Sequence, residues 1–403
     1  MLAAFLERLL KDKPDQDRFA RRFIAAVRAS GLDEPLRYDA GLFRLLRDDG
    51  SFLNLHNAHA AYLKAPRAQQ KAVLDQFVGM VSRPGKQVVS ADEARGMLLP
   101  ILRNLSQLEE VRIYHAERDG WDTVPEFRYR RIGQECAELL ALDHPEHTAT
   151  LTQGPEKDWN LDLDEAFSIA RDNLRSLPLV PFHPLAPGLF QAAWGDAYDS
   201  SRALLPELLH RLPLRGVPVF MVPTRDTLLV AGDRDPEAIT AMLEHAKRRL
   251  EDGRIISWEV FSHEAQQVVP YPLIDAGHRR QQGELRLLVE HDVHASQKQL
   301  LDRLHEVQGE DIFVASFLVD SEQGVSVCAW TRDVASSLPR TGRIAFVMPD
   351  GPDRADTLFV DWDLAMSVIG HLLKPDPRHI HPPRFLTSGF PDEDQLAQLR
   401  TLA

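Results

Sequence analysis

The chain has 403 residues, of which 44% are hydrophobic and 27% are charged, a balance that is typical of globular proteins and excludes disordered, fibrous and membrane-embedded classes. Lys and Arg number 47 against 60 Asp and Glu, so the formal net charge is −13, and such an acidic surface argues against general nucleic-acid binding. A local basic patch remains conceivable at Arg128–Arg131, although a strand with solvent-facing arginines is the simpler interpretation. The length predicts two or three domains.

The N-terminal segment and the cysteines both indicate a cytoplasmic protein. Residues 1–11 are apolar but are interrupted by Glu7 and Arg8, which is typical of an amphipathic helix and not of a signal peptide. No run of about 18 apolar residues occurs, so we expect no membrane span. Cys136 and Cys328 are expected as small buried side chains, because a secreted protein of this size usually has more cysteines in pairs.

The first third of the chain predicts helices around a small hairpin. A helix is expected over 14–30, because the apolar residues in it recur at the helical period and Gly31 follows. Its apolar face consists of Phe19, Phe23, Ile24 and Val27. Strands at 36–46 flank Ala40-Gly41, and Asp49-Gly50 predicts a turn into a further strand. A second helix is expected over 66–81.

The middle of the chain predicts alternating strands and helices. Residues 96–142 alternate in the manner of strands, for example at 111–115 and 127–130. A helix is expected over 162–175 with Asp162 as its cap. The segment 195–272 then predicts a helix that Pro206 kinks or restarts, a hairpin with strands at 217–222 and 227–231, a helix over 236–251, and two closing strands.

The last third predicts a separate unit. The polar segment 276–283 is flanked by glycines, and we expect a domain boundary there. Beyond it we expect a helix over 296–307, a hairpin, two further strands and a helix over 363–373, followed by a surface tail from Lys374. Together the elements predict an α+β fold with mixed, largely antiparallel sheets and packed helices. The expected domains are 1–85, 86–280 and 281–403.

Two motifs in the middle of the chain resemble those of a known family. Asp196–Arg202 has the form Asp-x-Tyr-Asp-x-Ser-Arg, and Val222–Leu228 has the form Val-Pro-x-x-Asp-x-Leu. With Leu99–Arg103 and Ala170–Arg175, these motifs make residues 35–272 similar to the YtpQ family, bacterial proteins built around a domain of unknown function. The resemblance implies an α+β cytoplasmic bacterial protein and supplies no catalytic residues. It does not extend to residues 284–403.

The same two motifs supply the candidate binding residues. A helix start with backbone N–H groups and an arginine clamp could hold an anion or a partner. The residues proposed for this cluster are Asp196, Tyr198, Asp199, Ser201, Arg202, Arg225 and Asp226. The alternative is structural, since Asp199 could cap the helix and Arg202 could pair with Asp226 or Asp196.

Other chemical signatures are weak, so we expect no catalytic residues, no metal and no cofactor. The close histidine pairs are His291 with His294 and His379 with His381, the latter among prolines at an expected surface. His263-Glu264 lacks the second histidine of a metalloprotease helix. Phosphate loops, dinucleotide fingerprints and nucleophile elbows are absent from the sequence.

The sequence therefore favours a non-enzymatic protein-interaction protein, such as a regulator, adaptor or immunity-type partner. Its expected partner is another protein, met through the acidic surface or the C-terminal part. The alternative is an enzyme or small-anion-binding protein that uses the cluster around Asp196–Arg202 with Arg225 and Asp226. Whether the chain is an enzyme stays open with a lean toward no, and neither nucleic acid nor membrane is an expected partner.

Overall fold

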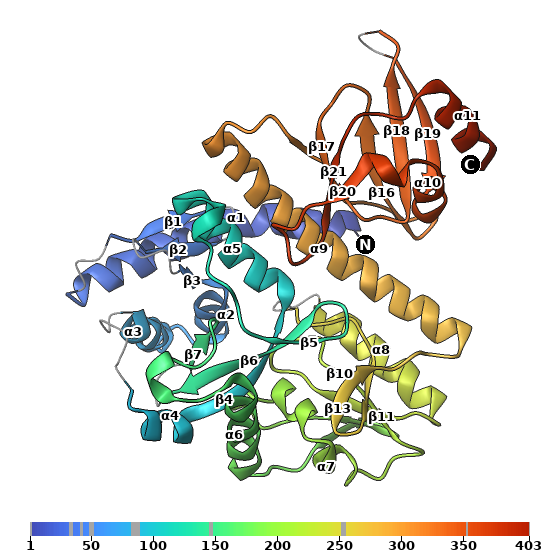
Figure 1. The fold of residues 1–403 in the computed structure, drawn as a ribbon. Coiled ribbons are helices and arrows are strands. Elements are labelled where there is room, and N and C mark those ends of the chain that lie inside the picture. Colours follow the sequence, from blue (N-terminus) through green and yellow to red (C-terminus); the bar gives the residue numbers. More distant parts are fainter. Residues whose placement is uncertain are drawn as a thin grey trace. The chain divides into compact units, whose positions relative to one another are not determined.

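The computed structural model describes residues 2–31, 35–40, 43–47, 52–81, 89–144, 148–250, 255–351 and 354–402. The chain divides into two compact units, one of residues 1–89 with 144–147 and one of residues 90–143 with 148–403. Figure 1 names their helices and strands. The α+β class with mixed, largely antiparallel sheets is confirmed, because all but two of the strand pairings described here are antiparallel.

The first unit packs helices onto a small antiparallel sheet of order β1-β2-β3. Its elements are α1 (Leu2–Ala29), β1 (Arg37–Asp39), β2 (Arg44–Leu46), β3 (Phe52–Asn54), α2 (His56–Lys64) and α3 (Gln70–Val81). Phe19, Phe23 and Val27 are buried from α1, as the helical period predicts, and they share a core with Leu45 of the hairpin. The expected Asp49-Gly50 turn lies outside the described residues.

The second unit begins with a four-stranded antiparallel sheet whose long strands are β4 and β6. Its elements are α4 (Ala91–Met97), β4 (Leu98–Asn104), α5 (Leu105–Asp119), β5 (Arg130–Ile132), β6 (Cys136–Asp143), β7 (Thr148–Leu151) and α6 (Leu163–Ser176). Short 3-10 turns lie at Trp121–Thr123 and Lys157–Trp159. Helix α6 packs on β4, so one face of this sheet is covered.

A six-stranded antiparallel sheet of order β13-β12-β10-β11-β9-β8 follows. Its elements are β8 (His183–Ala186), β9 (Leu189–Gln191), a 3-10 turn η3 (Ser200–Leu204), α7 (Pro206–Leu209), β10 (Pro218–Met221), β11 (Leu229–Gly232), α8 (Pro236–Leu250), β12 (Phe261–Glu264) and β13 (Gln267–Pro270). Phe220 points into one core and Met221 into another, because successive strand residues face opposite sides. The apolar runs of β10 and β11 therefore reflect burial on both faces.

The last part of the second unit holds two more sheets, of orders β14-β17-β21-β20 and β15-β16-β18-β19. Its elements are α9 (Ala276–Gln308), β14 (Phe313–Val314), β15 (Leu318–Asp320), β16 (Val325–Thr331), β17 (Ser336–Pro339), β18 (Arg343–Pro349), β19 (Ala355–Asp361), α10 (Trp362–Ile369), a 3-10 turn (Gly370–Leu372), β20 (Leu373–Pro375), β21 (Arg384–Thr387) and α11 (Glu393–Leu402). Their core contains the buried Trp330 and Phe346.

Three local expectations are wrong. Residues 127–130 are not one strand, because β5 begins only at Arg130. Residues 111–115 are not a strand but lie within α5, whose buried side chains include Leu105, Leu108 and Ile113. The polar segment 276–283 is not a linker but forms the first turns of α9, which Asp275 caps through its bond to the His278 N–H at 2.9 Å. Helix α9 continues without a break over 33 residues and packs against both α5 and α8. The domain boundaries themselves stay a prediction.

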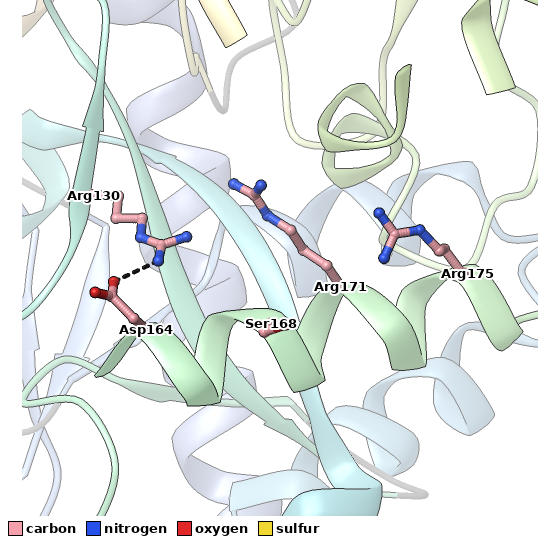
Figure 2. A pocket seen from close by; sticks show the side chains of 5 residues that line it. All are labelled: Arg130, Asp164, Ser168, Arg171 and Arg175. Carbon is pink, nitrogen blue, oxygen red and sulfur yellow. Dashed lines mark hydrogen bonds and ion pairs between the residues drawn. The ribbon is translucent and has the colours of Figure 1, made fainter. Parts of the chain in front are cut away.

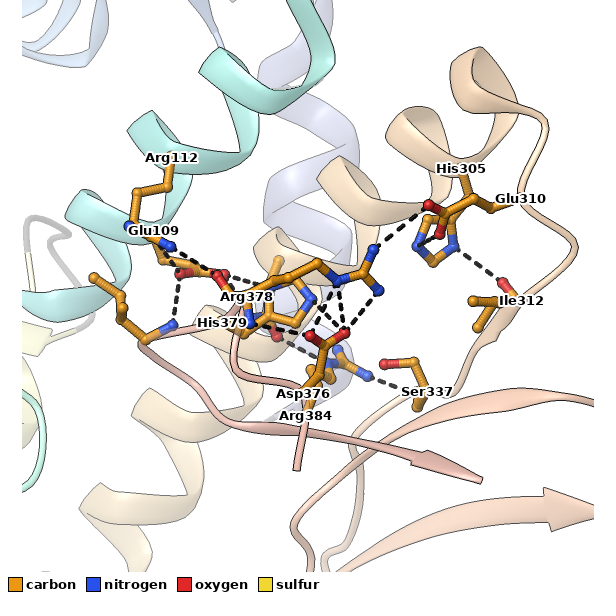
Figure 3. A network of polar contacts seen from close by, with 12 residues as sticks. Glu109, Arg112, His305, Glu310, Ile312, Ser337, Asp376, Arg378, His379 and Arg384 are labelled. Carbon is orange, nitrogen blue, oxygen red and sulfur yellow. Dashed lines mark hydrogen bonds and ion pairs between the residues drawn. The ribbon is translucent and has the colours of Figure 1, made fainter. Parts of the chain in front are cut away.

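The segment after Lys374 is also not a surface tail. Asp376, His379 and Arg384 are all buried, and β20 and β21 pair within a sheet. Figure 3 shows the network that holds this segment: the Glu109 carboxylate on α5 lies 2.6 Å from Nδ1 of His379 and accepts from the Ile380 N–H at 2.9 Å. Arg378 donates to both carboxylate oxygens of Asp376, through Nε to Oδ1 and through Nη2 to Oδ2. Proline and histidine content alone gives no sign of these distant partners.

Two further observations concern membranes and thiols. Among the described residues, every helix is either too short or too polar to cross a bilayer. Cys136 and Cys328 are both buried and free, as the sequence predicts.

The cap of α6 gives a first prediction. The Asp162 side chain accepts from the Glu165 N–H at 2.7 Å, as the sequence indicates. Asp162→Ala should lower the free energy of unfolding by about 1 kcal/mol, because one helix N–H loses its partner. Asp162→Asn, which can still accept this bond, should retain most of the stability in denaturant unfolding. Equal losses in the two variants would contradict the capping role.

Candidate functional site

The predicted cluster at Asp196–Arg202 is a packed ion pair. Nη1 and Nη2 of Arg202 donate to the two carboxylate oxygens of Asp196 at 2.8 and 2.6 Å, and the Arg202 side chain is 1% exposed. The guanidinium lies 4.3 Å from the centre of the Trp194 ring. Both donor groups of the arginine fork are therefore already used within the protein.

Asp199 does not cap a following helix, which corrects one structural expectation. Its carboxylate accepts from the backbone N–H groups of Trp194 at 2.8 Å and Gly195 at 3.1 Å, which precede it in the chain. The following residues, including the buried Ser201, form the short turn η3, and α7 begins at Pro206. Pro206 thus restarts the helix, one of the two roles expected for it.

The side chains of Arg225 and Asp226 have different surroundings. Asp226 lies 3.3 Å from Nη2 of Arg249 on α8, so of the two partners expected for Arg202 the structure has Asp196 and not Asp226. Arg225 is half-buried, its Nε atom has no partner among the described residues, and burial lowers its pKa although Tyr198 and Asp226 act against this. Tyr198 donates to Asp143 at 2.6 Å, and burial together with this bond raises the pKa of its hydroxyl.

A different place in the second unit brings three arginines together. A cavity of about 300 Å³ is lined by Arg130, Asp164, Ser168, Arg171 and Arg175, and we call it the arginine pocket. Four of these residues lie on α6, at a spacing that places them along one helix face, and Arg130 comes from β5. Figure 2 shows the guanidinium groups of Arg171 and Arg175 projecting to the same side of α6, with Arg130 joined to Asp164.

Each arginine of the pocket is held by a carboxylate. Arg171 donates through Nε and Nη2 to Glu138 at 2.9 and 2.6 Å, and Glu138 is 1% exposed. Arg130 lies 2.5 Å from Asp164 and 4.4 Å from the centre of the Phe167 ring. Arg175 donates to Glu207 and Asp172, each at 2.7 Å, and the bond to Glu207 chiefly raises the pKa of Arg175.

These ion pairs leave one N–H₂ group of each arginine without a hydrogen bond to the described part of the protein. Within the described residues, Nη1 of Arg130, Nη1 of Arg171 and Nη2 of Arg175 donate to no protein atom. None of the three is a buried atom without a partner, so they remain open to solvent. The carboxylates fix the guanidinium planes while one N–H₂ group of each arginine stays available to a ligand.

Two sequence segments that attract attention for other reasons contain residues of the arginine pocket. Arg130 belongs to the basic run at Arg128–Arg131, and Arg171 and Arg175 belong to the motif Ala170–Arg175. The spacing of Ser168, Arg171 and Arg175 on a helix was the available signal. The pairing of that helix face with a strand some 40 residues earlier has no local signature.

The histidines form no evident metal site. In the part of the chain that the structure describes, no three His, Cys, Asp or Glu side chains are arranged as metal ligands. Nε2 of His263 donates to the Ala203 carbonyl at 2.8 Å. His379, expected at the surface, is buried against Glu109.

No family model, curated protein or solved structure matches this chain. The resemblance to the YtpQ family therefore stays a prediction.

The Asp196–Arg202 pair leads to a pH prediction. Burial acts to raise the pKa of Asp196, but the hydrogen bonds from Arg202 and the Tyr198 N–H outweigh it, so this pKa lies below its ordinary value. A lowered carboxyl pKa contributes stability above the pKa of the unfolded chain, and the contribution is lost as the pH falls through the folded-state pKa. Asp196→Asn should therefore lower the free energy of unfolding by about 2 kcal/mol at pH 7, and the difference from wild type should shrink below pH 4.

Asp199→Asn provides the comparison for this experiment. Burial raises the pKa of Asp199, so the charged carboxylate is not favoured by folding there. Denaturant unfolding between pH 3 and 7 should show the acid-side convergence for Asp196→Asn alone. A constant difference at every pH would contradict the assigned role of the ion pair.

Proposed function

We propose that this protein is a cytoplasmic binding protein that recognises an oxyanion, a phosphate or a carboxylate, in the arginine pocket. The observation that carries the proposal is that three guanidinium groups line one cavity with a single carboxylate, Asp164, among the lining residues. Arginine presents planar pairs of donors that match the oxygens of these anions. The hydroxyl of Ser168, on the same wall, adds a neutral donor.

The charge of the whole chain makes this pocket selective. The net charge of −13 repels anions over most of the surface, and the four carboxylates that hold the three arginines offset their charge, so the attraction in this pocket comes from the open N–H₂ donors. Ligands that bind here are expected to have a compact, strongly charged group, because only such a group gains enough from three guanidiniums to overcome the general repulsion.

Binding without catalysis is the favoured form of the proposal. A guanidinium stays protonated at physiological pH and does not exchange protons with a substrate. The oxyanion can be carried by a protein partner, as we expect for an interaction protein, or by a small metabolite. Both sources offer the same chemistry to the arginine pocket.

Calorimetric titration with inorganic phosphate at constant ionic strength tests the recognition of the anion. The wild-type protein should bind phosphate saturably, and Arg130→Gln with Arg175→Gln should weaken binding about tenfold for each arginine, since a hydrogen bond to a charged group contributes about 1.5 kcal/mol. Arg171 is left in place, because its loss would strand the buried Glu138 carboxylate.

Arg332→Gln is a closely matched control. Arg332 is 36% exposed and pairs with Glu393, which is 84% exposed, while Arg130 is 36% exposed and pairs with Asp164, which is 86% exposed. Each of the two arginines also lies over a phenylalanine ring. Arg332→Gln should bind phosphate like the wild type, and equal affinity in the double variant and the wild type would overturn the proposal.

A pull-down from cells that carry the tagged chain separates the two sources of the anion. A partner protein that is released by phosphate and lost in the Arg130→Gln, Arg175→Gln variant indicates a protein-borne anion. Phosphate binding without any such partner indicates a free small molecule.

A further inference from the structure

A second cavity, separate from the arginine pocket, lies between α9 and the start of β15. It has a volume of about 580 Å³. One wall is a face of α9, and the other is the segment Ser316–Leu318. The α9 residues that line it are His291, His294, Ala295, Lys298, Gln299, Asp302, Arg303 and Glu306.

His294 is the unusual member of this lining. It is only 4% exposed, and its ring stacks on that of Phe317 with a centroid distance of 4.7 Å and an interplanar angle of 8°. Its Nδ1 atom has no hydrogen-bond partner among the described residues. Because a buried polar atom without a partner costs free energy, a ligand that brings an acceptor to the His294 ring would remove this cost.

A buried cation stands behind His294. Arg384 is 0% exposed; its Nε donates to Gln297 at 2.8 Å and its Nη1 to the Ala315 carbonyl at 2.8 Å. Its Nη2 has no partner, and within the described ranges no carboxylate lies within ion-pair distance of it. Burial chiefly lowers the pKa of His294, and the nearby charge of Arg384 acts in the same direction.

The other charges of the lining nearly cancel. Lys298 pairs with Asp302 at 2.8 Å, and Arg303 pairs with Glu117 at 2.5 Å. Among the described residues Arg384 has no direct ion pair, although the charges of Asp302 and Glu109 act on it, and its own charge acts on His294. The opposite wall offers apolar surface, since Leu318 is 55% exposed beside Phe317.

We propose that this cavity binds a small organic carboxylate, with the carboxylate group at His294 and an apolar or aromatic body against Phe317 and Leu318. The imidazole donates a hydrogen bond to the carboxylate, and the anion adds a negative charge near the buried Arg384. Binding involves no covalent step. The site does not depend on the arginine pocket, because the two cavities share no residue.

Titration of the full chain with benzoate, followed by calorimetry, tests this site. The wild-type protein should bind benzoate saturably, and benzamide, which has the same shape without the charge, at least tenfold more weakly. His294→Phe keeps a ring on Phe317 but removes both nitrogens, and it should weaken benzoate binding at least tenfold. The Arg130→Gln, Arg175→Gln variant should bind benzoate like the wild type.

A second variant, Ala295→Leu, keeps the inference testable if His294→Phe does not fold. Ala295 is exposed on the same cavity wall, so Ala295→Leu should fill the cavity without disturbing the core, and it should also abolish benzoate binding. Absence of saturable benzoate binding to the wild type would overturn the inference. So would unchanged benzoate binding in a folded His294→Phe or Ala295→Leu protein, or equal affinities for benzoate and benzamide.

Discussion

The carboxylate of Glu109 on α5 is almost removed from water, at 1% exposure, and the arrangement of the second unit depends on how this charge is satisfied. A buried carboxylate without partners would cost several kcal/mol. Its partners come from two distant segments: His379 and Ile380 from the loop before β21, and Gln297 from α9 at 3.4 Å. Gln297 in turn donates to the Pro382 carbonyl and accepts from Arg384, so α5, α9 and β21 are held together by one chain of contacts.

The fold follows from the sequence where the apolar period is unambiguous. Phe19, Phe23 and Val27 on α1, and the stripe of α8, are predicted and buried. The prediction fails at 111–115, where Val111, Ile113 and His115 alternate but lie on a helix. A short run of this kind fits both the helical period and the alternation of a strand. The elements that pack against α5 determine that a helix forms. The polar side chains Glu109 and Arg112 have their partners on the segment 378–380, which no local pattern reveals.

The site shows the same division between local and distant information. The cluster at Asp196–Arg202 has a distinctive composition, yet its charges satisfy one another, because Arg202 and Asp196 meet through both oxygens. The arginines of the arginine pocket look unremarkable in sequence, yet their carboxylate partners leave donors open. Composition identifies which side chains are charged. Only the tertiary structure shows which of them have hydrogen-bonding capacity left for a ligand.

The long separation between Glu109 and His379 also constrains how the chain is made. The two residues are 270 positions apart, and at about 5–20 residues per second roughly 14–54 s pass between their syntheses. Throughout that interval the Glu109 carboxylate has no partner from the loop before β21 and must stay hydrated. Helix α9 can cover part of this face earlier through Gln297, but the Glu109 carboxylate is fully satisfied only after residue 380 has been made.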